Sequence, residues 1–316
     1  MDVLTKARSR GTLIPCAASA TVGGEMPSSG SPTVRRRRLA AELRRIRGNR
    51  KAGEIARAVG WSPSKISRAE SGRESLPPEE IEKLIDFYGV AEPLRGRLLQ
   101  LADDAVQRSW WDDYADILTP QYLEFIGLEE EAADCHHWDP LIIPGLLQTE
   151  NYARQLNAAY HRVVPTIPPR VHDRFLQVRM RRQARLTREP VLQLSVVLEE
   201  SVLLRKVGDN VVMRDQLRHL ARAAELPNVN LRILRLSDTA GLVSGSFVIM
   251  KFGSQDSPDR GLGDVVSTEA LATEIYVEGE GDTQLYSIFF DSLQEAALSP
   301  AHSRQLIAAT IEREWS

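Results

Sequence analysis

The sequence predicts a multi-domain chain in which a small all-α domain of five helices precedes a larger α+β domain. Three observations carry this prediction. The length of 316 residues is too great for one small domain and sufficient for two. Apolar residues recur with helical spacing from Arg35 to about Gln107. Beyond Trp110, helical segments and strand-like segments alternate, and a hydrophobic content of 42% allows both domains to bury a core.

The N-terminal part of the chain divides into an irregular segment and a helical one. Residues 1–33 are rich in Ser, Gly, Pro and Ala without periodicity, so we predict a disordered extension. Residues 34–108 are predicted to form the all-α domain. Apolar periodicity and end signals place its helices at 35–48, 54–59, 62–71, 77–88 and 92–107.

The junction between the second and third helices carries dense turn signals. Gly60 is placed to end the second helix in the left-handed region. Ser62 is a good N-cap, and Pro63 suits the first helical position, where no amide donor is needed. Gly72 closes the third helix. Two short helices joined by a tight glycine-containing turn predict a helix-turn-helix.

Charge is distributed unevenly along the chain. Residues 31–75 hold 13 Lys/Arg against 4 Asp/Glu, whereas the other 271 residues hold 27 basic and 39 acidic groups. This asymmetry predicts a polyanionic partner for the N-terminal end only. Because an α-helix fits the major groove, double-stranded DNA is the expected partner. A solvated basic face is the alternative reading of such a run of charges.

The third helix and the start of the first helix supply the candidate DNA contacts. They are Ser62, Ser64, Lys65, Ser67, Arg68, Arg73, Arg36 and Arg38. Arg68 is expected to donate two hydrogen bonds to guanine O6 and N7. The short serines allow the helix to approach the base edges closely. The remaining basic side chains are expected to contact phosphates.

Three strings in this region also carry a family resemblance. They are Glu54-Ile55-Ala56, Val59-Gly60-Trp61-Ser62 and Ser64-Lys65-Ile66-Ser67-Arg68-Ala69-Glu70-Ser71-Gly72-Arg73. Over about 70 residues the chain resembles the Xre family, the phage-repressor-type helix-turn-helix proteins. The resemblance implies that the positions of Ser64 and Arg68 read bases.

The same resemblance implies a structural ion pair. It predicts a buried salt bridge from Glu70 to an arginine of the first helix, and the spacing makes that arginine Arg45. Glu70 is then structural and not a DNA contact. The sequence departs from the family pattern before the second helix, where a buried Leu and a Ser/Thr cap are usual. Arg50 and Lys51 stand there instead.

The second domain, residues 109–316, is predicted to be a mildly acidic α+β unit that begins at a hinge near Trp110-Trp111. Helical patterns lie at 120–134, 149–160, 170–187, 209–225, 287–297 and 301–314. Strand-like runs lie at 191–198, 229–236, 246–252 and 274–278.

Two blocks in the second domain carry a further resemblance. The string at 143–153, from Ile143 through Pro144-Gly145 to Ala153, is similar to a hallmark of a C-terminal domain on many actinomycete Xre-type regulators. The block Arg179-Met180-Arg181-Arg182-Gln183 matches a second block of that domain. Such regulators often pair with a small partner protein encoded beside them, in an arrangement likened to toxin and antitoxin. The resemblance implies a regulatory or partner-binding role. For Pro144-Gly145 itself, we favour a structural turn before the helix that Thr149 opens, and a ligand-binding role is the alternative.

Other chemistry has little support in the sequence. Adjacent residues such as Cys135-His136-His137 rarely ligate one ion together, so we expect no metal. Two cysteines without CxxC spacing predict no disulfide framework. The segment 241–245 is not a nucleophile elbow, and no phosphate-binding glycine loop is present, so we expect no catalytic residues and no cofactor. No apolar run reaches the length of a membrane span.

These patterns favour a cytoplasmic, sequence-specific transcription regulator that is homodimeric and not an enzyme. A rival hypothesis is an antitoxin-like protein that binds a small partner and autoregulates its own operon. A third is an enzyme tethered to DNA.

Overall fold

The computed structural model describes residues 34–72, 76–106, 109–163, 169–238, 244–252, 263–270 and 273–316. The predicted disordered segment 1–33 and the candidate contact Arg73 lie outside these residues, as does most of the segment 241–245.

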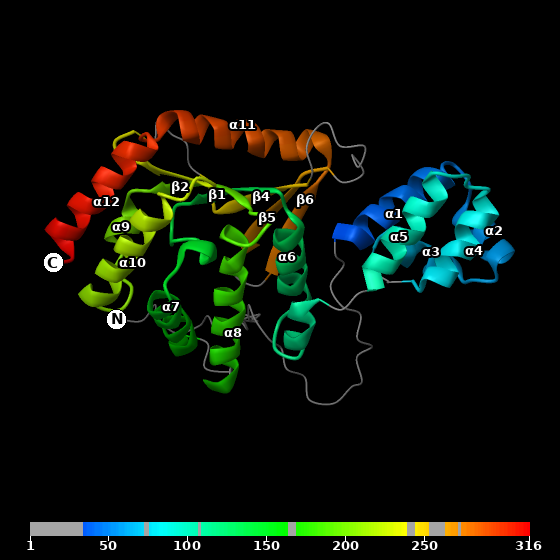
Figure 1. The fold of residues 1–316 in the computed structure, drawn as a ribbon, viewed down its shortest axis with the longest axis horizontal. Coiled ribbons are helices and arrows are strands. Elements are labelled where there is room, and N and C mark those ends of the chain that lie inside the picture. Colours follow the sequence, from blue (N-terminus) through cyan, green and yellow to red (C-terminus); the bar gives the residue numbers. More distant parts are fainter. Residues whose placement is uncertain are drawn as a thin grey trace, which may run out of the picture.

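Between residues 34 and 106, the described part of the chain forms five helices (Figure 1). They are α1 (Val34–Arg47), α2 (Ala52–Val59), α3 (Pro63–Glu70), α4 (Pro78–Tyr88) and α5 (Leu94–Val106). Their apolar faces meet in one core that includes Leu43, Ile55, Ile66, Leu84 and Leu98. The predicted five-helix domain is therefore confirmed.

The described residues of the C-terminal domain contain a mixed six-stranded sheet of order β3-β2-β1-β4-β5-β6. The strands are β1 (Asp134–Asp139), β2 (Gln193–Glu199), β3 (Val229–Leu234), β4 (Phe247–Lys251), β5 (Val265–Ala270) and β6 (Thr273–Glu278). β1 pairs in parallel with β2, and β2 with β3, whereas the pairings of β1 with β4, β4 with β5 and β5 with β6 are antiparallel. The predicted order of an α domain followed by an α+β domain is confirmed.

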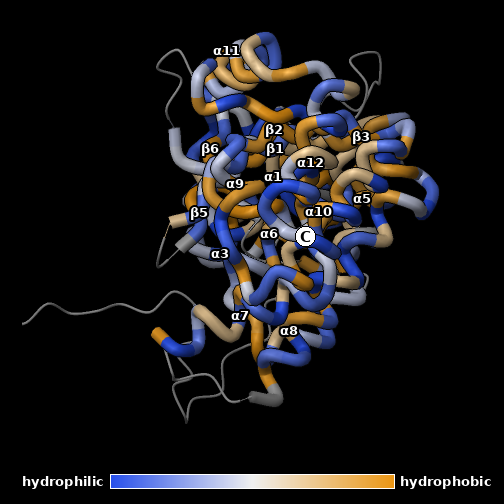
Figure 2. The backbone as a smooth tube through the Cα atoms, turned by 90° about the vertical axis from the view of Figure 1, so that its left-hand side faces the viewer, coloured by the Kyte–Doolittle hydropathy of each residue, from blue (hydrophilic) through white to orange (hydrophobic). Residues whose placement is uncertain are grey.

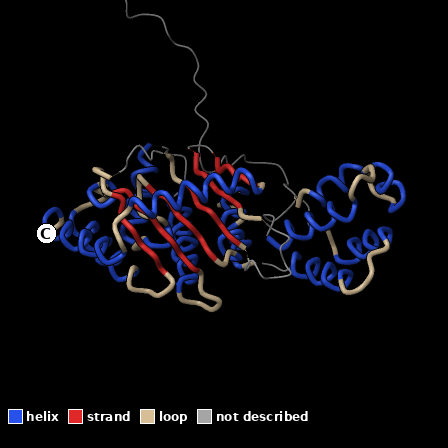
Figure 3. Tube along the Cα trace, turned by 90° about the horizontal axis from the view of Figure 1, so that it is seen from above, coloured by secondary structure: helices blue, strands red, loops and turns tan. Residues whose placement is uncertain are grey.

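Helices cover both faces of this sheet (Figures 1 and 3). The α-helices are α6 (Pro120–Glu131), α7 (Glu150–Val163), α8 (Pro169–Arg182), α9 (Ser201–Leu204), α10 (Asn210–Ala223), α11 (Glu280–Ala296) and α12 (Pro300–Glu314). Short 3-10 helices lie at η1 (Trp110–Tyr114), η2 (Gly145–Leu147) and η3 (Gln183–Leu186). α11 lies along one face, while α6, α7, α8 and α10 lie on the other (Figure 1).

Each face of the sheet has its own apolar core. Trp138 and Phe247 pack against Phe290 of α11, and the larger core on the opposite face joins Val196 and Leu231 to helices that include α10 and α12. Hydrophobic residues concentrate on the central strand β2, whereas the helices alternate between hydrophobic and hydrophilic residues (Figure 2). Burial on two sides explains why β2 reads as a nearly continuous apolar run.

Two strands were not predicted from the sequence. β1 reads Asp-Cys-His-His-Trp-Asp, so its charged ends and paired histidines hide the pattern of a buried strand. β5 mixes Val265 and Val266 with Ser, Thr and Glu, and its run is too short and too polar to stand out. α11 also begins at Glu280 and not at 287, because its polar first turn carries no apolar periodicity.

Candidate nucleic-acid interface

The turn between α2 and α3 is built from local backbone chemistry. Gly60 adopts φ 73° and ψ 28°, a left-handed conformation that favours glycine, and the amide of Trp61 donates to the carbonyl of Ala56 at 2.7 Å. The Ser62 hydroxyl then accepts from the amide of Lys65 at 3.2 Å, with Pro63 at the first helical position. The predicted turn and cap are confirmed.

One exposed stripe runs along α3. Ser64, Ser67, Arg68 and Ser71 are all exposed, and their spacing of three and four residues places them on one face of the helix. Three residues of the opposite face, Ile66, Ala69 and Glu70, are buried. The exposed residues of the stripe carry hydroxyl groups and one guanidinium, and the stripe has no large side chain besides Arg68. A helix with this face can approach base edges closely.

Lys65 is less available for a DNA contact than the residues of the stripe are. Its ammonium group lies 2.6 Å from a carboxylate oxygen of Glu80 and 4.6 Å from the ring centroid of Trp61. Its side chain is 23% exposed. A phosphate that contacts Lys65 must therefore compete with Glu80 for the same ammonium group.

The expected partner of Glu70 was wrong. Glu70 is buried as predicted, but both of its carboxylate oxygens accept hydrogen bonds from Nε of Arg47, at 2.7 and 2.9 Å. Arg47 lies one turn after the buried Leu43 and shares its inward face. Arg45 points outward, where it bonds Glu42 of its own helix at 2.8 Å.

The ion pair of Glu70 lies beside Tyr88 at the end of α4. Burial and the negative charge of Glu70 raise the pKa of Tyr88 to about 12. Arg50 lies over the Tyr88 ring at 5.5 Å from its centroid, and the side chain of Lys51 provides no cap for α2. Arg50 and Lys51, the two residues that depart from the family pattern, therefore lie at the start of α2, which has no side-chain cap, and Arg50 packs on the Tyr88 ring.

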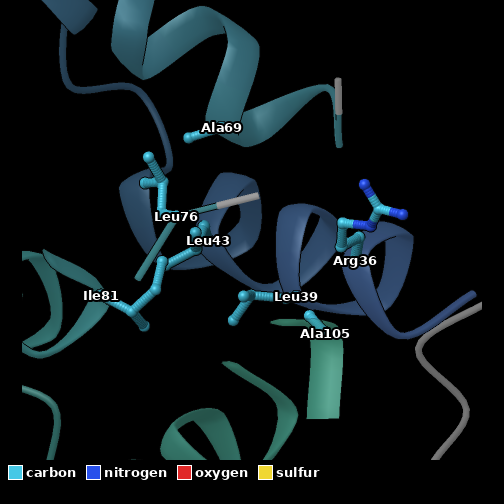
Figure 4. A pocket seen from close by; sticks show the side chains of 7 residues that line it. All are labelled: Arg36, Leu39, Leu43, Ala69, Leu76, Ile81 and Ala105. Atoms are coloured by element: carbon cyan, nitrogen blue, oxygen red, sulfur yellow. The ribbon is translucent and has the colours of Figure 1, made fainter. Parts of the chain in front are cut away.

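The first turn of α1 does not present both predicted arginines to solvent. Arg36 is only 8% exposed and lines a cavity of about 10 Å³ with Leu39, Leu43 and Ala105, among others (Figure 4). Such a space is about the limit for one water molecule. Arg36 is therefore not on an open phosphate-binding surface in this structure. Arg38 is half-buried, which leaves it partly accessible.

Three glutamines organise the segment around Pro144-Gly145. Gln148 donates to the carbonyl of Ile143 at 2.6 Å, Gln183 donates to the carbonyls of Gly145 and Gln148, and Gln216 donates to the carbonyl of Leu147. Backbone groups of this irregular segment therefore find partners although it is largely buried. The geometry supports the structural reading of this motif.

Among the residues that the structure describes, the most deeply buried ion pair was not predicted from the sequence. Arg182 of α8 donates two hydrogen bonds of 2.7 Å to the carboxylate of Glu129 of α6, and the side chains are 7% and 1% exposed. The Tyr122 hydroxyl accepts a third bond from Arg182. Glu129 begins an acidic run that reads as solvent-exposed in sequence, so only the position of α6 against α8 reveals the pair.

The Cys135-His136-His137 string lies on β1, where alternate side chains point to opposite faces. Cys135 joins the larger core, while His136 stacks on Phe290 of α11 at 4.7 Å between ring centroids. The alternation of side chains along the strand therefore places Cys135 and His136 on opposite faces of the sheet. His136 lies 3.0 Å from an oxygen of Asp134.

Comparison with protein families gives the class of this chain. A model described as a helix-turn-helix domain matches residues 38–98, which supports a DNA-binding regulator. A second model, described as a domain of unknown function (DUF5753), matches residues 122–309, more than half of the chain. The protein therefore belongs to the DUF5753 family. No curated protein and no solved structure matches it. None of the helices in the described residues combines the length and apolar character needed to cross a membrane.

Proposed function

We propose that the protein is a cytoplasmic, sequence-specific transcription regulator of the Xre type. In this proposal residues 34–108 form the DNA-binding unit and α3 lies in the major groove. The observation that carries it is the exposed stripe of Ser64, Ser67 and Arg68 on a capped helix. Arg68 reads a guanine, while the serines allow close approach. Glu70 and Arg47 hold α3 against α1 from the buried side.

The C-terminal domain, residues 109–316, supplies dimerisation or response in this proposal. One recognition helix contacts only a few base pairs, so a single copy gives little sequence preference. Two copies related by a two-fold axis read half-sites about one helical turn apart, roughly 34–36 Å. The excess of acidic residues outside 31–75 favours a protein partner over DNA for this domain.

A second candidate function is that of an antitoxin-like protein, which restrains a small partner and uses DNA binding for autoregulation. Leu285 and Ile288 of α11 support it, because they lie about one turn apart and are 65% and 54% exposed. Co-purification with the product of a neighbouring short reading frame, lost in Leu285→Asp/Ile288→Asp, tests this alternative.

Selection from a randomised duplex library tests the main proposal. We expect the full-length protein to enrich one motif with two related half-sites. Sedimentation of the complex gives the number of copies bound, and we expect two. Recovery of random sequences at all salt concentrations would contradict sequence-specific recognition.

A further inference from the structure

Arg37, in the first turn of α1, lies against an acidic surface of the C-terminal domain. Its guanidinium bonds the carboxylates of Glu124 on α6 and Glu278 on β6, and it lies 5.7 Å from the ring centroid of Tyr276. The Arg37 side chain is 13% exposed and that of Glu124 is 16% exposed, whereas Glu278 is 53% exposed. We call Glu124, Tyr276 and Glu278 the acidic surface.

This acidic surface is held in shape by its own domain. The Tyr276 hydroxyl lies 2.7 Å from the carbonyl oxygen of Gln121 at the start of α6 and 2.6 Å from a carboxylate oxygen of Glu274. These contacts join β6 to α6, the two elements that carry Glu278 and Glu124. The surface therefore presents two carboxylates and an aromatic ring in fixed positions for one guanidinium.

A second arginine of the same turn also faces acidic groups. Burial lowers the pKa of Arg36, and the charges of Asp112 and Glu131 act in the opposite direction. Asp112 belongs to η1 and Glu131 ends α6, so both lie in the C-terminal domain. Negative charge from three elements of that domain thus surrounds the first turn of α1.

The first turn of α1 is also next to the end of the recognition helix. A methyl group added at Gly72, just after α3, would lie 3.6 Å from the Cα atom of Arg37 and 3.7 Å from the carbonyl carbon of Arg36. If α3 lies in the major groove, this turn is close to the phosphates at the edge of that groove. Carboxylates and phosphates accept hydrogen bonds from a guanidinium in the same way, so they compete for it.

We propose that the acidic surface is an interaction surface for the first turn of α1, and that it competes with DNA phosphates for Arg37. The docked C-terminal domain occupies Arg37 and places Glu124 and Glu278 where they repel the DNA backbone. Undocking releases the arginine and removes the repulsion. The inference rests on the proposed DNA-binding function and adds intramolecular regulation to it.

DNA titration of the full chain tests the competition. The probe is a random-sequence duplex of about 30 base pairs, because phosphate attraction does not depend on sequence. Glu124→Gln/Glu278→Gln is expected to bind about threefold to tenfold tighter than wild type, because it removes both carboxylates that hold Arg37, one of which is half-exposed. The control Glu295→Gln/Glu312→Gln makes the same change of charge at exposed positions of α11 and α12, and it is expected to change affinity less than about twofold.

Small-angle scattering tests the docking without DNA. Glu124→Lys/Glu278→Lys repels Arg37 and should increase the radius of gyration, and adding Arg37→Glu should restore it by reversing the charges. If the radius of gyration stays the same in both variants, the proposed docking of Arg37 on the acidic surface is overturned. Equal DNA affinity for the variant and its control overturns the competition. Absence of DNA binding by wild type and every variant overturns the proposed function instead.

Discussion

The two domains bury charge in different ways. In the DNA-binding domain, Glu70 is 6% exposed but its partner Arg47 is 25% exposed, so water reaches one side of the pair. In the C-terminal domain, Glu129 and Arg182 are 1% and 7% exposed, and the arginine makes two parallel bonds. The Glu70–Arg47 pair holds α3 against α1 on the side opposite the exposed stripe of α3. The second is part of the interior of its domain.

The largest expected loss of stability follows from breaking the Glu129–Arg182 pair. Glu129→Gln leaves the Arg182 charge buried without its counter-ion, which should lower the free energy of unfolding by about 3–5 kcal/mol. Urea denaturation of the full chain measures this loss in the transition of the C-terminal domain. Glu129→Leu/Arg182→Met, which removes both charges, should recover most of the stability. If the double variant is as unstable as the single one, lost packing and not an uncompensated charge is the cause.

Breaking the shallower pair should cost less. Glu70→Gln keeps the shape of the side chain but removes the charge opposite the partly solvated Arg47, so we expect a loss of about 1–3 kcal/mol. Glu42→Gln is the matched control, since Glu42 bonds the 63% exposed Arg45 and should contribute less than about 1 kcal/mol. Thermal melts that show equal losses for the two variants would remove the special role of Glu70.

Glu274 gives the C-terminal domain a dependence on pH. Burial raises its pKa from 4.5 to about 7, so the folded state favours the protonated carboxyl. A protonated Glu274 can donate to the Tyr276 hydroxyl while that hydroxyl donates to Gln121. The stability from this group is therefore fully present below about pH 4.5 and is lost as pH rises through about 7.

Glu274→Gln mimics the protonated form at all pH values. Its free energy of unfolding, measured by urea denaturation, should match that of wild type near pH 5 and exceed it at pH 8, by an amount on the order of 1–2 kcal/mol after allowance for partial solvation. A difference that stays constant between the two pH values would show that Glu274 does not titrate in this range.

The smallest effect contrasts two helix starts within the DNA-binding domain. Ser62→Ala removes the cap of α3 and should cost about 1 kcal/mol. Lys51→Ser should stabilise the uncapped start of α2 by a few tenths to about 1 kcal/mol. If both substitutions shift the melting temperature in the same direction, the expected difference between the capped start of α3 and the uncapped start of α2 is contradicted.

Whether the sequence predicts a contact in this protein depends on how far apart in the sequence the two residues lie. The α2–α3 turn could be predicted because Gly60, Ser62 and Pro63 act within a few residues. The partner of Glu70 required the rotation of α1 against α3, and the burial of Leu43 was the available signal that favoured Arg47 over Arg45. No local pattern relates Arg37 to Glu278, 241 residues away, so that contact had no sequence signal.

Binding of the Arg68→Ala variant to the selected operator tests base reading by α3 most directly. Arg97→Ala, which removes an exposed arginine from α5, is the matched control for lost charge. Arg68→Ala should weaken operator binding by about 1–3 kcal/mol and abolish the preference at one base position, while Arg97→Ala keeps every preference. Equal weakening of Arg68→Ala on operator and random duplexes, with the base preferences unchanged, would contradict recognition by α3.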